Sequence, residues 1–543
     1  MMKVIDRRKI AVSIMLSFAF AVMQIAGYQI SMTYNTSVHR SAFFQNIGVL
    51  SKVQCILFGI IEGVFWSVIL YLLFTLLERI KFPVKEHCGR INILLWFLVS
   101  VLMFACWIPC FLAGYPGFYN YDAFSQVPQA LYEEVQYYAH HPLIHTLVMG
   151  KIIAFGYHHG VDLNDGIALH SITQMAFCAL VFSYILCYLR KRTGRLWFCI
   201  VAFCYYAFFP LIPMFAMSTT KDTIFSALLL LTVILLHEMC MDMTAFFASK
   251  WNVMKFVVIS LLMCLFRKNG IYAVVCAVPF IIFLYRKYWR QILLLFGAIT
   301  ILSVASNRGL MWILHADAGS AEEMFSVPMQ QIARVYNDYG EEAFEEEELE
   351  MIYEGISEDD LLNYDPFLSD HIKNYFDFNV ILDNKMDYLL LWVKKGMQYP
   401  GGYWKAFLEN TYQAWYPGTS IYNEPYADQT FYFDMGMWPG GYRDTKMPGL
   451  LNFYEKISTE IYYQKFPILR LFFSIGAMFW VTLFVFGFAV YQKNRPMAAA
   501  MLLVLTYCLT VLMGPISLVR YYLVLFYGFP VSIGYLLSGY KQV

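Results

Sequence analysis

The sequence predicts an all-α polytopic membrane protein with about twelve transmembrane helices and a mostly helical extracytoplasmic domain inserted between spans 9 and 10. Two features of its composition indicate this class: 59% of the 543 residues are apolar, and only 14% are charged. Soluble domains carry about 25% charged residues. The third feature is the repetition of apolar runs of about 20 residues, the length that crosses a bilayer. Together these features exclude a chain of soluble domains and a disordered chain.

Twelve stretches have the length and composition of membrane spans. They are 10–30, 53–77, 91–113, 165–189, 196–214, 222–240, 251–267, 271–286, 291–311, 467–490, 497–514 and 521–538. Helices are expected because a span in lipid must satisfy its own backbone hydrogen bonds. The predicted organisation is two N-terminal spans with their inner loop (1–90), a membrane core (91–311), an acidic domain (312–466) and three C-terminal spans (467–543).

The basic residues of the short loops favour a cytoplasmic N-terminus and a location in the cell (plasma) membrane. Clusters of Lys and Arg at 7–9, 190–195 and 286–290 would then all lie inside, as the positive-inside rule requires. The block 312–466 would lie outside. It holds 27 acidic and 10 basic residues, against 12 and 29 in the remainder of the chain. Nucleic acid is not an expected partner, because the acidic block repels phosphate.

Two predicted outer segments are long. The first, residues 114–164, contains a helix after the motif YPGFYNYDAFSQ and a second short helix after HHP. The second helix is too short to span and has one apolar face, so it is expected to lie on the membrane surface. The residues of this face are Leu143, Ile144, Leu147, Val148, Ile152 and Phe155. The acidic block is expected to form helices at 381–397, 402–415 and 448–466. The charge run EEAFEEEELE is expected to be a solvated face or loop.

Asp122 is the first candidate catalytic residue. It follows the third span on the outer side, beside Tyr121 and Gln126, which are candidate substrate-binding residues. Asp122 could simply cap the helix that follows. A carboxylate at a membrane surface could also be the general base for a hydroxyl nucleophile. Both interpretations can hold together.

The histidines of the motif HHPLIHT are candidate substrate contacts. His141 and His145 are four residues apart, a spacing that zinc sites use. Pro142 stands where a zinc protease motif has its glutamate, and no third ligand is evident. No metal site is therefore predicted. The cofactor remains unknown: a divalent cation could take part, but no ligand pattern indicates one.

Four cations lie at the predicted outer ends of spans, against the positive-inside trend. They are Lys221, Arg267, Lys268 and Arg520. Each alone could reach towards lipid headgroups. For four separate outer ends, an anionic ligand is the better explanation, and a lipid-linked phosphate suits it. Lys221 also follows hydroxyl residues at a helix start, an arrangement that binds phosphate.

The order of these motifs resembles the C-type glycosyltransferases, polytopic enzymes that use polyprenyl-phosphate sugars. The motifs YPGFYNYDAFSQ, HHPLIHT, STTKD, RKNG and LVRYY look still more like an uncharacterised bacterial membrane-protein family often grouped with them. The resemblance covers roughly 91–540. It implies that Asp122 is the base and that Lys221, Arg520 and Tyr521 bind the donor. The chain departs from the superfamily in having no Asp-Asp or Glu-x-Asp pair after Asp122, which puts metal dependence in doubt.

Three functions are therefore weighed. The favoured one is an inverting glycosyltransferase that moves a sugar from a polyprenyl-phosphate donor to a glycan, glycolipid or protein acceptor on the outer face. The second is a transporter or flippase of lipid-linked sugars that does no chemistry. The third is a scaffold whose acidic block binds a partner. Transporters often show paired repeats and broken spans, and none is evident in this sequence.

Overall fold

A computed structural model describes residues 6–34, 48–79, 92–120, 122–319, 322–418, 441–458 and 466–538. Within these ranges every named element is a helix, and β-structure is limited to isolated bridges. Seven helices in the described part of the chain are long and apolar enough to cross a membrane. They are α1 (Arg7–Thr33), α3 (Lys52–Arg79), α4 (Ile93–Ala113), α7 (Leu163–Thr193), α10 (Lys221–Met241), η1 (Arg286–Tyr288) continued by α14 (Trp289–Ile313), and α24 (Ile475–Gln492). The predicted all-α membrane class is confirmed for the described residues.

The other predicted spans are also helical, but they are shorter or interrupted. The uninterrupted ones are α12 (Lys250–Phe266), α13 (Asn269–Leu284) and α25 (Arg495–Val511). The predicted span 196–214 is instead two helices, α8 (Leu196–Phe208) and α9 (Leu211–Ala216). Phe209 between them is extended, because the ring of Pro210 disfavours a helical conformation of the preceding residue.

The spans at the C-terminal end are broken as well. The predicted span 467–490 consists of α23 (Pro467–Phe473) and α24, separated by Ser474, whose hydroxyl accepts from the Ala477 amide and caps α24. The predicted span 521–538 consists of η6 (Val519–Tyr522), α26 (Leu523–Tyr527) and α27 (Phe529–Leu537). The first of these short elements, η6, carries Arg520 and Tyr521 of the site described below.

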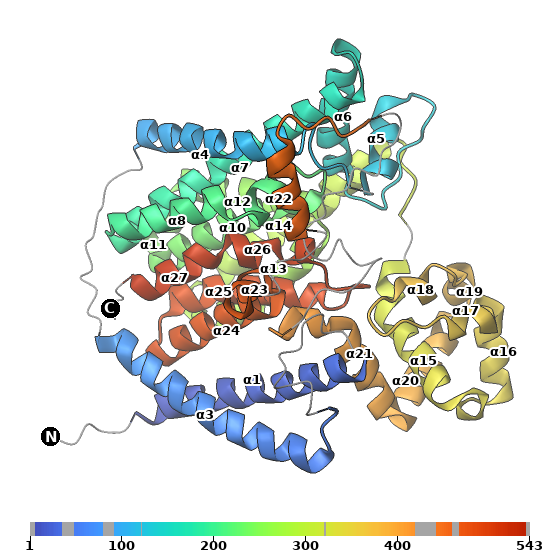
Figure 1. The fold of residues 1–543 in the computed structure, drawn as a ribbon. Helices are drawn as coiled ribbons and strands as arrows, with labels where there is room; N and C mark the ends of the chain where they lie inside the picture. Colours follow the sequence, from blue (N-terminus) through green and yellow to red (C-terminus); the bar gives the residue numbers. More distant parts are fainter. Residues whose placement is uncertain are drawn as a thin grey trace.

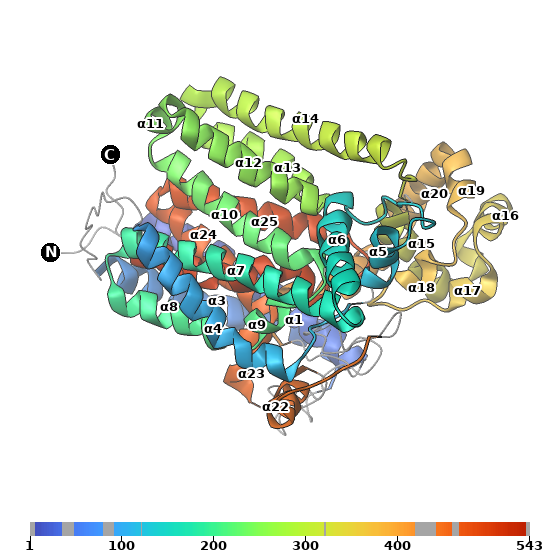
Figure 2. The same cartoon turned by 90° about the horizontal axis from the view of Figure 1, so that it is seen from above.

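Helix α10 forms the centre of the bundle. Its sequence is apolar on every side, and nearly all of its side chains are buried, as expected of a helix surrounded by others. It packs against α7, α12, α25 and α26, and α14, α12, α10 and α7 lie side by side in Figure 2. By contrast, α1 and α3 form a hairpin at the edge of the bundle (Figure 1), and most of α3 is exposed.

The first predicted outer segment contains α5 (Asp122–Leu131) and α6 (Leu143–His159). Both lie at the end of the bundle where α10 begins, and α6 runs steeply across the direction of α7 and α10 (Figure 2). Helix α6 packs on α5, α7 and α12, burying Thr146, Met149 and Ile153. The face predicted to touch lipid is only partly outward: Val148 and Phe155 are exposed, but Leu143 is buried.

Within the acidic block, residues between 329 and 403 form a small core of their own next to α5 and α6, whereas the end of α21 (Pro400–Trp415) and α22 (Pro448–Ser458) pack into the core of the helix bundle. The helices of the block include α15 (Ser326–Tyr339), α16 (Glu346–Gly355), α17 (Glu358–Leu362), α18 (Asp370–Lys373) and α21. The predicted helix 381–397 was wrong in its continuity: α19 (Phe378–Asp383) and α20 (Lys385–Gln398) are separated at Asn384. Asn leaves a helix readily because its side chain competes for backbone hydrogen bonds. The predicted helix 448–466 is α22 (Pro448–Ser458), and 459–465 lie outside the described residues.

The charge run is more than a solvated loop. Glu345 and Glu348 form a reciprocal capping box at the start of α16. Glu348 is largely buried and forms ion pairs with Lys394, at 2.9 Å, and Lys395, at 2.6 Å. The other acids of the run are mostly exposed. The run therefore starts a helix and ties it to α20.

A buried ion pair joins the acidic block to the first span. Arg334 of α15 donates to Glu409 of α21 at 2.6 Å, and Tyr34, at the end of α1, donates to Glu409 at 3.0 Å. Arg334 also donates to Asp338 at 2.8 Å. The Arg334 and Glu409 side chains are 4% and 1% exposed. Removing one partner would therefore leave a desolvated charge.

We expect Arg334→Ala to destabilise the protein by about 3–5 kcal/mol, the usual cost of an unpaired buried charge. The measurement is thermal unfolding of the detergent-solubilised protein. Lys394→Ala is the control, because Lys394 is 38% exposed and a surface pair contributes at most about 1 kcal/mol. An equal loss of stability in the two variants would contradict the conclusion that the buried Arg334–Glu409 pair joins the acidic block to the first span.

Candidate functional site

The candidate site lies where the segment before α5 meets the start of α10. Phe118 pairs with the 217–219 segment: its amide donates to the Met217 carbonyl at 3.1 Å, and its carbonyl accepts from the Thr219 amide at 2.9 Å. Asn120 adds a bond from its amide to the Thr219 hydroxyl at 2.8 Å and one from its side chain to the Ser218 hydroxyl at 2.7 Å. This pairing brings Asp122 next to Lys221, 99 residues later.

Gly117 allows the segment before Asp122 to lie close to α7. Its φ of 141° lies in a region that side chains disfavour. A Cβ at this position would collide with the Ser171 hydroxyl of α7. That hydroxyl donates to the Pro116 carbonyl at 3.0 Å. The turn before Asp122 is therefore pressed against α7.

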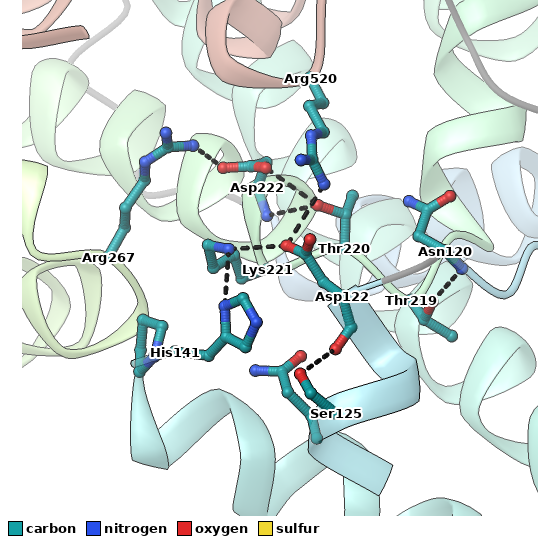
Figure 3. A network of polar contacts seen from close by, with 12 residues as sticks. Asn120, Asp122, Ser125, His141, Thr219, Thr220, Lys221, Asp222, Arg267 and Arg520 are labelled. Carbon is teal, nitrogen blue, oxygen red and sulfur yellow. Dashed lines mark hydrogen bonds and ion pairs between the residues drawn. The ribbon is translucent and has the colours of Figure 1, made fainter. Parts of the chain in front are cut away.

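Asp122 forms ion pairs with two cations that come from different helices. Its Oδ2 accepts from Lys221 Nζ at 2.8 Å and lies 3.3 Å from Arg520 Nη1. Lys221 Nζ also lies 3.3 Å from His141 Nδ1. Figure 3 shows these side chains converging from α5, α10 and η6. Among the described residues, no backbone amide donates to the Asp122 carboxylate, so capping does not account for its position.

A second carboxylate, Asp222, organises the neighbouring cation. It is fully buried, forms an ion pair with Arg267 and accepts from the Thr220 hydroxyl at 2.9 Å. Thr220 is the N-cap of α10. Sequence reasoning missed Asp222, although it stands in the quoted motif STTKD. An acid directly after the candidate Lys221 was the available signal.

Tyr521 links the two carboxylate-bound arginines. Arg267 lies over its ring at 4.4 Å from the centroid, and Arg520 Nη2 donates to its hydroxyl at 3.1 Å. Both contacts hold guanidinium groups in fixed orientations. The result is one continuous network, which we call the anion cluster: Asp122, His141, Lys221, Asp222, Arg267, Arg520 and Tyr521.

The other predicted site residues lie around this cluster. Lys268 is at its exposed rim and donates to the Ala139 carbonyl at 3.2 Å. Gln126 is buried and donates to the Thr146 hydroxyl at 3.1 Å. His145 is completely buried, and within the described part of the chain neither of its ring nitrogens has a hydrogen-bond partner. Tyr121 lies outside the described residues.

Burial and charge together set the protonation states at the site. Burial alone would raise the pKa of the Asp122 carboxyl, but the charges of Arg520 and Lys221 outweigh it and hold this pKa well below its ordinary value. Burial and the charge of Lys221 lower the pKa of His141 to about 3. At neutral pH Asp122 is therefore a carboxylate and His141 is a neutral imidazole.

The arrangement favours anions over metal ions. Three cations of the cluster, Lys221, Arg267 and Arg520, contact two carboxylates, so the cluster carries an excess of positive charge, to which Lys268 at the rim adds. Both carboxylates are already paired with cations. Among the described residues no group of three His, Cys, Asp or Glu side chains could hold a metal ion. A cleft of about 770 Å³ lies nearby, between residues 129–137 and the outer turns of α6, but no cluster residue lines it.

We expect His141 to make stability depend on pH. Because its pKa is about 3 in the folded protein and about 6.5 when unfolded, the unfolded chain binds more protons between these values. Stability contributed by neutral His141 is thus lost as pH falls, by about 2 kcal/mol between pH 6.5 and pH 5. Thermal unfolding at pH 7.5 and pH 5 should show a smaller pH effect in His141→Gln than in the wild type. An unchanged pH effect would contradict a neutral, buried His141.

Comparisons with known proteins place the chain in a family. Residues 133–537 match a family described as "Family of unknown function (DUF6020)". The matched region begins after Asp122 and includes Lys221, Arg267 and Arg520. No curated protein and no solved structure matches the chain. Since the match spans well over half of the chain, the protein belongs to the DUF6020 family of unknown function.

Proposed function

We propose that this protein is an inverting membrane glycosyltransferase that moves a sugar from a polyprenyl-phosphate donor to a hydroxyl of a glycan, glycolipid or protein acceptor on the outer face. The observation that carries this proposal is the anion cluster. A single carboxylate, Asp122, lies against two cations, Lys221 and Arg520, at the N-terminal end of a central helix. Such an arrangement supplies both a proton acceptor and a phosphate site.

The proposed topology has twelve spans, a cytoplasmic N-terminus and an extracytoplasmic acidic domain in the cell membrane. Its support is the course of the chain in Figures 1 and 2: α1 begins and α3 and α7 end at the end of the bundle opposite α5, α6 and the acidic block. The basic residues Arg7, Arg79 and Arg190–Arg195 lie at these helix ends. The positive-inside rule assigns that end to the cytoplasm.

The reaction would be a single displacement at the anomeric carbon of the donor sugar. The acceptor oxygen bonds to this carbon while the bond to the phosphate oxygen breaks, and the electron pair stays on the phosphate. The proton of the acceptor hydroxyl passes to the Asp122 carboxylate. Lys221 and Arg520 hold the leaving phosphate by hydrogen bonds to its oxygens, which strengthen as negative charge builds there.

This assignment conserves charge within the cluster. Protonation removes one negative charge from Asp122 just as the phosphate gains one. The total negative charge of Asp122 and the phosphate next to Lys221 and Arg520 is therefore the same before and after transfer. Because the site is largely buried, a charge imbalance would be costly, and this exchange avoids it.

We expect Asp122→Asn to lose turnover by about 10²–10⁴-fold, the usual contribution of a general base. Asn cannot accept the proton, although it has nearly the same size and shape. The measurement is transfer to a water-soluble or lipid acceptor, after a panel of polyprenyl-phosphate sugars has identified the donor. Asp359→Asn, at an exposed acid of α17, is the matched control and should retain wild-type turnover. Near wild-type turnover of Asp122→Asn would instead favour transport of lipid-linked sugars.

The proposed topology predicts which residues a membrane-impermeant thiol reagent can reach. In intact cells, Glu346→Cys on the acidic block should be labelled and Arg79→Cys at the end of α3 should not. Both positions are exposed in the fold, so burial does not explain a difference. After the cells are opened, Arg79→Cys should become labelled. The reverse pattern would overturn the orientation and the outer location of the anion cluster.

A further inference from the structure

The two cations proposed to hold the donor phosphate already have a counter-ion in this structure. Lys221 Nζ and Arg520 Nη1 both approach the same oxygen, Oδ2 of Asp122. The three side chains are 14%, 6% and 7% exposed. Arg267 differs, because its carboxylate partner is Asp222. Asp122 is therefore the specific counter-ion of Lys221 and Arg520.

This contact describes the protein before the donor binds and not the arrangement during the proposed transfer step. In a single displacement the attacking and leaving oxygens lie on opposite sides of the anomeric carbon. A carboxylate that accepts the proton of the attacking hydroxyl therefore lies away from the cations that hold the leaving phosphate. Asp122 contacts those cations directly, so it has to leave them before it can act as the base.

We infer that Asp122 is a built-in competitor of the donor phosphate: it occupies the cation pair Lys221–Arg520 in the resting protein, and the phosphate ester of the donor displaces it. This inference rests on the proposed function. The ligand class is an anionic phosphate ester attached to an isoprenoid chain. Displacement exchanges one set of charge-assisted hydrogen bonds for another, so the cations stay paired throughout.

The exchange orders the two substrates. Before the donor binds, two ion pairs at Oδ2 hold the Asp122 carboxylate beside Lys221 and Arg520, which is not the position from which it could accept the proton of an attacking hydroxyl. Once phosphate takes the cations, the carboxylate is released and can accept a hydrogen bond from the acceptor. The proton acceptor thus becomes available only when a sugar donor is in place.

The test measures binding of farnesyl phosphate, a short isoprenoid phosphate, to the full-length protein in detergent by titration calorimetry. Farnesol, which lacks the phosphate, is the probe for binding by the chain alone. Asp122→Asn removes the competing charge and leaves both cations, so it should bind farnesyl phosphate at least tenfold more tightly than the wild type. Farnesol should bind the two proteins equally.

Asp338→Asn is the matched control. It removes the same charge from an ion pair with Arg334, outside the anion cluster, and should leave the affinity unchanged. Arg520→Ala should weaken phosphate binding. One outcome is that the wild type binds farnesyl phosphate more tightly than farnesol, while Asp122→Asn binds farnesyl phosphate no more tightly than the wild type does. In that case the proposed competition by Asp122 is wrong, and the phosphate site of the proposed function is supported. If neither protein distinguishes the phosphate from the alcohol, the phosphate site of the proposed function is itself wrong.

The loss of Asp122 removes a counter-ion from two buried cations, Lys221 and Arg520, so the variant could unfold in detergent. Thermal unfolding then gives the second measurement. Asp122→Ser keeps a residue that favours helix starts and also removes the charge. Both variants should melt at a lower temperature than the wild type, and farnesyl phosphate should raise their melting temperatures by more than it raises that of the wild type. An equal or smaller rise would overturn the inference.

Discussion

The desolvated contact of Asp122 with Lys221 and Arg520 is the interaction on which the arrangement of the bundle end that carries α5 and α6 depends. It joins α5, α10 and η6, three elements that lie far apart in the sequence. Each side chain carries a charge that could not be buried alone without a cost of several kcal/mol. The pairing of Phe118 with the 217–219 segment, the caps at Thr220 and the position of Gly117 all serve to bring these charges together.

The acidic block is coupled to the same contact through the loop that precedes η6. Asn410 of α21 donates to the Gly514 carbonyl at 3.1 Å, and the Ser369 amide donates to the Pro515 carbonyl at 3.0 Å. Leu368 packs against Ile516 and Leu518. Leu518 is two residues before Arg520. Asn410 is also next to Glu409, the buried partner of Arg334. The acidic block therefore helps to set the position of Arg520 and is more than an acidic surface.

The placement of helices was predictable to different degrees. Long apolar helices such as α3, α7 and α10 were predicted within a few residues, because length and composition are local properties. The breaks at Phe209, Ser474 and Asn384 were not predicted. Each break depends on the conformational preference of a single residue. The sequence prediction was made from the overall character of long segments, in which one residue has little weight. The inward face of α6 was also missed, since Thr146 and Met149 are buried by neighbouring helices that only the fold supplies.

By itself, the sequence determined the all-α membrane class, the division between a basic body and an acidic block, and the separate identities of Asp122, His141, Lys221, Arg267 and Arg520 as unusual residues. These follow from hydropathy and from charges that stand at odds with their surroundings. Only the tertiary structure decided which charges pair: Asp122 with Lys221 and Arg520, and Asp222 with Arg267. An ion pair forms only when the two charges are close together and shielded from water. In an unfolded chain these side chains are far apart and hydrated, so the sequence does not show which charges pair. The sequence identified the ions, and packing determined the counter-ion of each.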